Sequence, residues 1–322
     1  MINKHLILSL LALLLVACSE KSIQTTFTEA QLSIKEINTA LLNEQKVDEV
    51  KYLPFSEAYL KDRHLILKNV AFTSLTAEQQ SELQYLIIQE RYPERYLPWP
   101  AITNVAKHLN SAQKAAWQKL VVSKLKEAQE SKIFYNRYEL EQLIDYSKSD
   151  NLDDLQAYLE GYKPRSRLGL YQLPNGKEWY QSKINYYYSA VEKPITLLAK
   201  IQKVSSEQKT NSTILENFDL IEVAKQNCKI EAGLNWIEQY INLPATFKNC
   251  DMSKLSKYRK SVLVLAEVDL GIHYQAWSEQ QALVTLVQKL EIDNIQAKAL
   301  LTDIIFKPAA VLAAARPFLL DN

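Results

Sequence analysis

The sequence predicts an all-α protein, a multi-helix array with few or no strands. Only 5 of its 322 residues are glycine, and glycine is required by tight hairpin turns but is unfavourable inside helices. Apolar residues recur three and four positions apart through most of the chain, which is the helical period. No segment sustains the alternation of apolar and polar residues, bounded by turn dipeptides, that is typical of strands.

The amino-terminal segment predicts export and a lipid anchor. After a basic start, residues 6–17 are apolar or uncharged, a length typical of a secretion signal and shorter than the about 20 apolar residues of a membrane span. The tetrapeptide 15–18, Leu-Val-Ala-Cys, resembles the bacterial lipobox. The resemblance implies cleavage before Cys18, diacylglycerol on its sulfur and an acyl chain, typically palmitate, on its amino group. Because Ser19 and not aspartate follows, the sorting rule of Gram-negative lipoproteins implies the outer membrane, facing the periplasm.

The rest of the chain divides into expected helices in two halves. Thr76 and Gln79 form a capping-box pattern before an apolar stripe, and Ser111 begins a helical run. Three prolines make residues 92–100 the expected hinge. The expected organisation is a signal peptide at 1–17, a tether at 18–27, an N-terminal helical half at 28–92 and 101–150, and a C-terminal half at 151–322. Further helices are expected at 136–147, 151–161, 175–190, 194–209, 213–241, 253–268, 278–290 and 293–306, with a short apolar stretch at 309–320.

Composition excludes several classes of function. The chain has 38 Lys and Arg against 37 Asp and Glu, so no basic excess points to nucleic acid. The few glycines are too widely spaced for a dinucleotide fingerprint or a phosphate-binding loop. The 4 histidines never fall at the spacing that would let one helix offer two of them to zinc. We therefore expect no cofactor, no metal and no nucleic acid. The expected partners are the membrane, which the lipid on Cys18 would enter, and an unknown protein or peptide.

The remaining cysteines, Cys228 and Cys250, favour a disulfide over two buried free thiols. Cys18 is committed to lipid in this interpretation, and the periplasm is oxidising. With 21 residues between the two cysteines, such a bridge would stabilise the fold by about 3 kcal/mol in the chain-entropy picture.

Two segments of the C-terminal half resemble the bacterial domain-of-unknown-function 885 family. Residues 168–180, Leu-Gly-Leu-Tyr-Gln-Leu-Pro-Asn-Gly-Lys-Glu-Trp-Tyr, resemble its Gly-Leu/Val-x-x-Leu-Pro-x-Gly-x-x-x-Tyr segment. Residues 268–273, Val-Asp-Leu-Gly-Ile-His, and 277–282, Trp-Ser-Glu-Gln-Gln-Ala, resemble its Val-Asp-Thr-Gly-Ile-His and Gly-Trp-Ser/Thr-x-Glu-Gln-Ala segments, in the same order. Weaker similarity lies at 231–240, to a Glu-Gly-Trp segment, and at 306–313, to a Val-Trp-Pro-Gly-Gln-Ala-Leu-Ala segment.

The resemblance implies a helical frame that is often secreted or lipid-anchored and that carries, in the family, the zinc-peptidase-like motif His-Glu-x-x-x-Gly-His-His. That chemistry needs two imidazoles, a carboxylate ligand and a carboxylate base. Only the carboxylate ligand carries over, as Glu231, since the chain contains no His-Glu dipeptide. The stretch from Leu173 to Glu231 is shorter than in the family, and Ala310 and Ala314 stand where its pattern has Gln and Tyr. The chain therefore looks like a degenerate member that lacks the zinc motif.

The candidate catalytic residues are Glu231, Glu238 and His273. The two glutamates are seven positions apart on one expected helix, so they would share a face, which His273 could approach. The favoured alternative to a catalytic site is that Glu231 and Glu238 are a solvated carboxylate pair and that His273 is hydrogen-bonded within its own turn.

The leading hypothesis is a lipid-anchored, periplasm-facing helical protein. It would be a non-catalytic remnant of a metallopeptidase-like frame that binds a partner or ligand. The alternatives are a cell-envelope hydrolase or peptidase with a site around Glu231 and His273, and a purely structural lipoprotein without a concave pocket.

Overall fold

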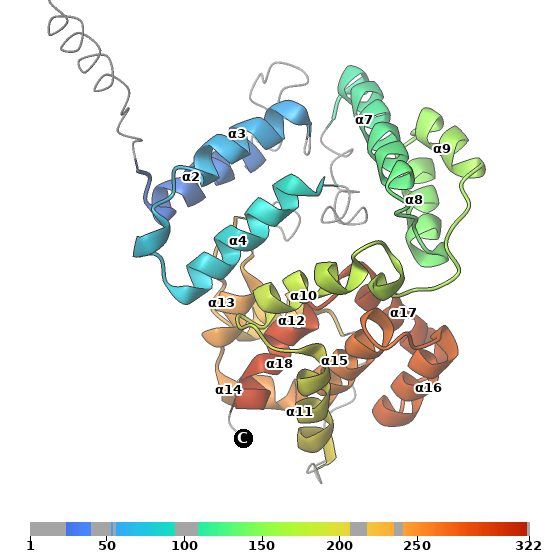
Figure 1. The fold of residues 1–322 in the computed structure, drawn as a ribbon. Coiled ribbons are helices and arrows are strands. Elements are labelled where there is room, and N and C mark those ends of the chain that lie inside the picture. The colour runs from blue at the N-terminus through green and yellow to red at the C-terminus, as the bar shows by residue number, and fades with distance from the viewer. Residues whose placement is uncertain are drawn as a thin grey trace, which may run out of the picture.

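The described part of the molecule is entirely helical in its regular structure. The computed structural model describes residues 24–39, 53, 56–93, 109–206, 218–234 and 241–320. Over these residues it contains helices and three isolated β-bridges but no strand, so the prediction of an all-α multi-helix array is confirmed (Figure 1). The expected signal peptide, Cys18, Glu238 and most of the expected hinge lie outside the described residues.

Most of the described residues lie in helices. In chain order the α-helices are α2 (Phe27–Thr39), α3 (Glu57–Leu67), α4 (Ala77–Arg91), α7 (Ser111–Glu130), α8 (Arg137–Ser149), α9 (Asp153–Glu160), α10 (Gly176–Tyr187), α11 (Pro194–Ser206), α12 (Leu220–Asn227), α13 (Leu243–Lys248), α14 (Met252–Leu255), α15 (Arg259–His273), α16 (Glu279–Leu290), α17 (Asn294–Phe306) and α18 (Val311–Leu320). Short 3-10 helices lie at η1 (Phe72–Ser74), η3 (Leu170–Gln172) and η4 (Ser256–Tyr258).

Local capping explains where several helices begin. Thr76 and Gln79 form the expected capping box of α4, with each side chain bonded to the other residue's backbone N–H. Helix α7 begins at Ser111 as expected, capped reciprocally by Asn110 and Gln113. Such boxes satisfy amide groups that a helix start would otherwise leave unpaired. The sequence therefore contains the start signals of these helices in readable form.

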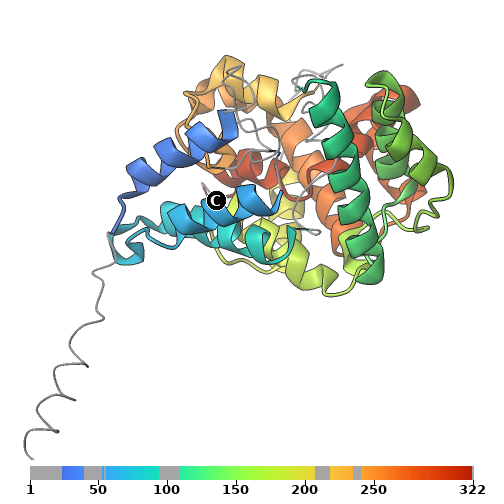
Figure 2. The ribbon, with the colours of Figure 1, turned by 90° about the horizontal axis from the view of Figure 1, so that it is seen from above.

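Helix α15 is the centre of the largest apolar cluster. Every residue from 261 to 273 is buried, and the helix packs against α11, α16, α17 and α18 (Figures 1 and 2). A second cluster joins α7, α8 and α9, and a third joins α2, α3 and α4 with Leu234. Because α9 packs with α7 and α8, the second cluster includes residues on both sides of position 150.

The expectation of a single helix over residues 213–241 is wrong for the described residues. Helix α12 ends at Asn227, and Cys228 is extended, with φ −125° and ψ 160°. Ala232 then pairs with Ile241 in an antiparallel bridge. Tertiary contacts replace the helical hydrogen bonds, because the backbone N–H of Leu234 donates to Glu82 Oε1 on α4 at 2.9 Å.

Glu82 fastens this non-helical segment to α4. Its side chain is buried, with 2% of the residue exposed, and Oε2 accepts from Asn242 Nδ2 at 2.6 Å. Glu82→Ala would leave the Leu234 N–H and the Asn242 amide without this acceptor inside the protein. We expect it to lower the free energy of unfolding by about 2–3 kcal/mol in urea denaturation.

Glu78, one turn earlier on α4, is the matched control. It pairs with Lys248 Nζ of α13 at 2.7 Å, but both side chains are partly exposed to solvent. Glu78→Ala should therefore cost less than about 1 kcal/mol. Equal losses for the two variants would show that the burial of Glu82 contributes nothing.

Candidate functional site

The segments 168–180, 268–273, 277–282 and 306–313, which resemble the family, meet around the C-terminal part of α15. Gly169 lies so close to this helix that a Cβ on it would stand 1.9 Å from the Ile272 carbonyl oxygen. Trp277 covers Gly271, since a Cβ there would meet the indole ring at 2.3 Å. The backbone of Ala309 donates to Asp269. Gly169, Trp277 and Ala309, from separate segments, thus converge on one buried end of α15.

Asp269 is the acidic group at this convergence. It is fully buried, accepts the hydroxyl hydrogen of Tyr180, and accepts the Ala309 N–H at 2.9 Å through Oδ2. Burial raises the pKa of Asp269 from 3.8 to about 7, although both hydrogen bonds act in the opposite direction. Burial also raises the pKa of Tyr180 well above its ordinary value. The pair joins α10 to α15 across 89 positions of sequence.

Ala309 adopts a left-handed conformation, with φ 68°. An alanine in this region is strained, whereas glycine is not. The Ala309 backbone thus adopts a geometry that glycine would adopt without strain. The turn aims the Ala309 N–H at Asp269 and leads into α18.

His273 is a structural histidine in this fold. It is fully buried at the end of α15, its Nδ1 accepts the Leu170 N–H at 3.3 Å, and its Nε2 lies 3.2 Å from the Ile304 carbonyl oxygen. Since Leu170 donates to Nδ1, the ring hydrogen is on Nε2 and is donated to Ile304. Burial, together with the charges of Arg165 and Lys183, lowers the pKa of His273 to about 3. Both ring nitrogens are therefore occupied and the ring is neutral.

Glu231 belongs to a different hydrogen-bond network. Its backbone N–H donates to Thr246 Oγ1 at 3.0 Å, and its carboxylate lies 3.5 Å from both Lys229 Nζ and Asn249 Nδ2. Glu231 is not in a helix, so the expected shared helix face with Glu238 is wrong. The side chain is 32% exposed, and the structure gives it no partner in common with His273 among the residues described.

A disulfide joins Cys228 to Cys250, with their Cα atoms 4.3 Å apart. It closes the loop that contains Glu231 and ties the end of α12 to the segment after α13. Replacement of both cysteines by serine should lower the free energy of unfolding by about 3 kcal/mol, because the unfolded chain gains the freedom that the bridge removes. Chemical denaturation without reductant measures this loss. The oxidised wild type treated with dithiothreitol should lose a similar amount, and an unchanged midpoint in both cases would contradict the prediction.

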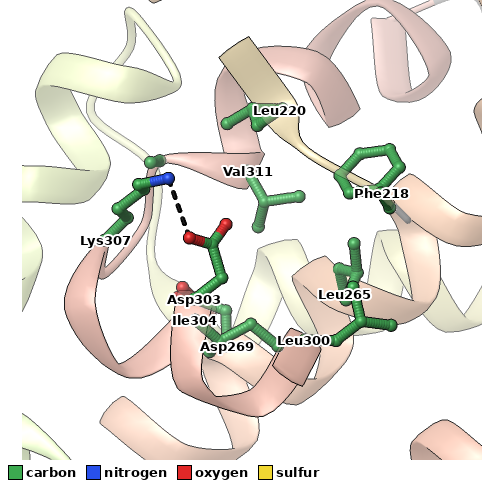
Figure 3. Close-up of a pocket in the computed structure, with 10 residues that line it drawn as sticks. Phe218, Leu220, Leu265, Asp269, Leu300, Asp303, Ile304, Lys307 and Val311 are labelled. Carbon is green, nitrogen blue, oxygen red and sulfur yellow. Dashed lines mark ion pairs between the residues drawn. The ribbon is translucent and has the colours of Figure 1, made fainter. Parts of the chain in front are cut away.

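A pocket lies beside the buried carboxylate (Figure 3). It opens partly to solvent, and its interior has room for about one water molecule. Its lining is mainly apolar and comes from α15, α17, α18 and the start of α12, as Phe218, Leu220, Leu265, Asp269, Leu300, Asp303, Ile304, Lys307, Ala310 and Val311. Asp303 and Lys307 form an ion pair at 2.7 Å in its wall. The lining thus presents apolar surface beside one charged pair.

Sequence reasoning missed both this pocket and the Tyr180–Asp269 pair. The pocket residues are ordinary core positions of separate helices, and only their packing makes them one surface. Asp269 and Tyr180 were visible as motif residues, but their contact depends on how α10 packs against α15. Among the described residues, no group of three His, Cys, Asp or Glu side chains could hold a metal ion.

Comparison of the chain with protein-family models, with curated proteins and with solved structures finds no match. The geometry defines a helical frame with a buried polar centre and an adjoining apolar pocket.

Proposed function

We propose that this chain is a lipid-anchored, periplasm-facing protein of the outer membrane that binds a partner or ligand without zinc catalysis. It would be held by lipid on Cys18 and would retain the frame of a metallopeptidase-like ancestor without its metal site. The shallow pocket of Figure 3 would contact an apolar group of the bound molecule at its mouth. No helix of the described residues is both long and apolar enough to cross a membrane.

The occupied ring of His273 is the observation that carries this proposal. Both of its nitrogens face backbone groups inside the protein, and its lowered pKa reflects its burial. A general base or metal ligand must present a free nitrogen to water or substrate. Asp269 also makes its hydrogen bonds inside the protein, since its oxygens accept from Tyr180 and Ala309. The polar residues of the resembled segments thus support the frame.

A hydrolase around Glu231 and His273 receives no support from this geometry. Glu231 bonds near α13 and His273 bonds to η3 and α17. A catalytic pair would need both groups within hydrogen-bond reach of one reacting molecule.

Metal content and lipidation test the two parts of the proposal separately. The purified chain, incubated with excess zinc and dialysed, should retain far less than one zinc per chain by elemental analysis. One zinc per chain in the wild type and none in Glu231→Ala would contradict the non-catalytic part. The amino-terminal peptide should carry the mass of three acyl chains on residue 18, and Cys18→Ser should lose that mass. An unlipidated wild-type peptide would contradict the anchoring part.

A further inference from the structure

We infer that η1 (Phe72–Ser74), the turn between α3 and α4, contacts the phospholipid surface that holds Cys18. This inference rests on the proposed lipid anchor and adds an orientation to it. Thr25 lies seven positions after Cys18 in the chain, and its backbone bonds to the residues just before η1.

Thr25 is fastened to the chain immediately before η1. Its N–H donates to the Asn69 carbonyl at 2.8 Å, and its carbonyl accepts the Ala71 N–H at 3.4 Å. Seven residues can span at most about 25 Å when fully extended. An anchored Cys18 would therefore keep the start of η1 within about that distance of the lipid headgroups, whatever path the intervening residues take.

The exposed side chains of this turn suit a phospholipid surface. Phe72 exposes 41% of its surface although it is a large apolar residue, and Thr73 and Ser74 beside it are also exposed. An exposed aromatic ring beside small polar residues is suited to the boundary between headgroups and acyl chains.

The charge along residues 63–77 points the same way, although the exposed Glu29 is bonded to Thr26 beside Thr25. No aspartate or glutamate occurs between Asp62 and Glu78, whereas Lys68 is exposed. A lysine without carboxylates nearby in sequence favours approach to lipid phosphates. Because the acyl chains would supply most of the affinity, contact by Phe72 would mainly set which edge of the molecule faces the membrane.

Site-specific fluorescence in vesicles tests the contact. The full chain carrying Thr73→Cys is lipidated in cells, purified without reductant, labelled with an environment-sensitive dye and bound to phosphatidylethanolamine–phosphatidylglycerol vesicles. Cys228 and Cys250 are bridged and Cys18 would carry lipid, so only the new thiol reacts. Lipids with a nitroxide near the headgroup should quench this dye at least twofold.

Ile295→Cys is the control, because Ile295 is 82% exposed and α17 lies on the opposite side of the molecule from η1 in Figure 1. Its dye should remain unquenched, and adding Phe72→Ser to Thr73→Cys should reduce the quenching. A chain that floats with the vesicles but shows equal quenching at both sites overturns the contact alone. A chain that fails to float overturns the lipid anchor and the contact together.

Discussion

Gly169→Ala should lower the free energy of unfolding by about 3 kcal/mol or more, or prevent the protein from accumulating in folded form. The new methyl group would lie 1.9 Å from the carbonyl oxygen of Ile272. That oxygen belongs to α15, which is packed on all sides, so neither backbone can move without disturbing the core. The displacement would also pull Leu170 away from His273, whose Nδ1 accepts its N–H.

Gly161→Ala provides the matched control. Nothing lies within 4 Å of the Cβ that this change would add, and the backbone there has an ordinary φ of −92°. Alanine should be neutral or slightly stabilising at this position, since it restricts the unfolded chain. Urea denaturation of the two variants measures the difference. Equal stability would show that the close approach at Gly169 does not exist in solution.

Asp269→Asn should become more stable relative to the wild type as the pH rises from 4 to 8. Burial raises the pKa of Asp269 from 3.8 to about 7, so the folded protein holds this proton more tightly than the unfolded chain does. The stability that the protonated form contributes is complete below pH 3.8 and is lost as the pH rises through about 7. Asparagine keeps an acceptor for Tyr180 and Ala309 but does not titrate, so the variant escapes that loss.

The folding equilibrium constant of Asp269→Asn, divided by that of the wild type, should rise by up to roughly tenfold per pH unit between pH 3.8 and about 7. Urea denaturation at a series of pH values measures it. A pH-independent difference between Asp269→Asn and the wild type would show that Asp269 titrates normally.

His273→Gln should show the opposite trend. In the wild type, burial lowers the pKa of His273 from 6.5 to about 3 in the folded state. The neutral ring therefore contributes stability that is present above pH 6.5 and is lost as the pH falls through 3. The variant should therefore become more stable relative to the wild type as the pH falls. In the wild type, the pH dependences of stability caused by Asp269 and His273 have opposite signs between pH 4 and 6.5. We therefore expect the free energy of unfolding of the wild type to vary less with pH than that of either variant.

The helical elements were predictable where local signals suffice. Thr76 and Ser111 mark helix starts, because a cap is formed by residues that are neighbours in sequence. The segment after Asn227 was not predictable in this way. Its apolar residues have helical spacing, but Glu82, 152 positions earlier than Leu234, binds its backbone instead.

The candidate site was predictable only in part. The resembled segments identified His273, Gly169 and Gly271, but not what those residues do. The motif could equally place a histidine in a reactive cleft or inside a core. Its partners, Leu170 and Ile304, come from other elements and are 103 and 31 positions away.

The sequence by itself determined the helical class and the starts of several helices, and it carries the lipobox-like segment that makes the periplasm the expected compartment. The tertiary structure alone decided that His273 and Asp269 are buried supports, that Glu231 is not helical, and that a pocket adjoins α15. The physical reason is the range of the interactions. Caps and apolar periodicity act within a few residues, whereas burial and hydrogen bonding of these groups depend on which faces of distant helices pack together.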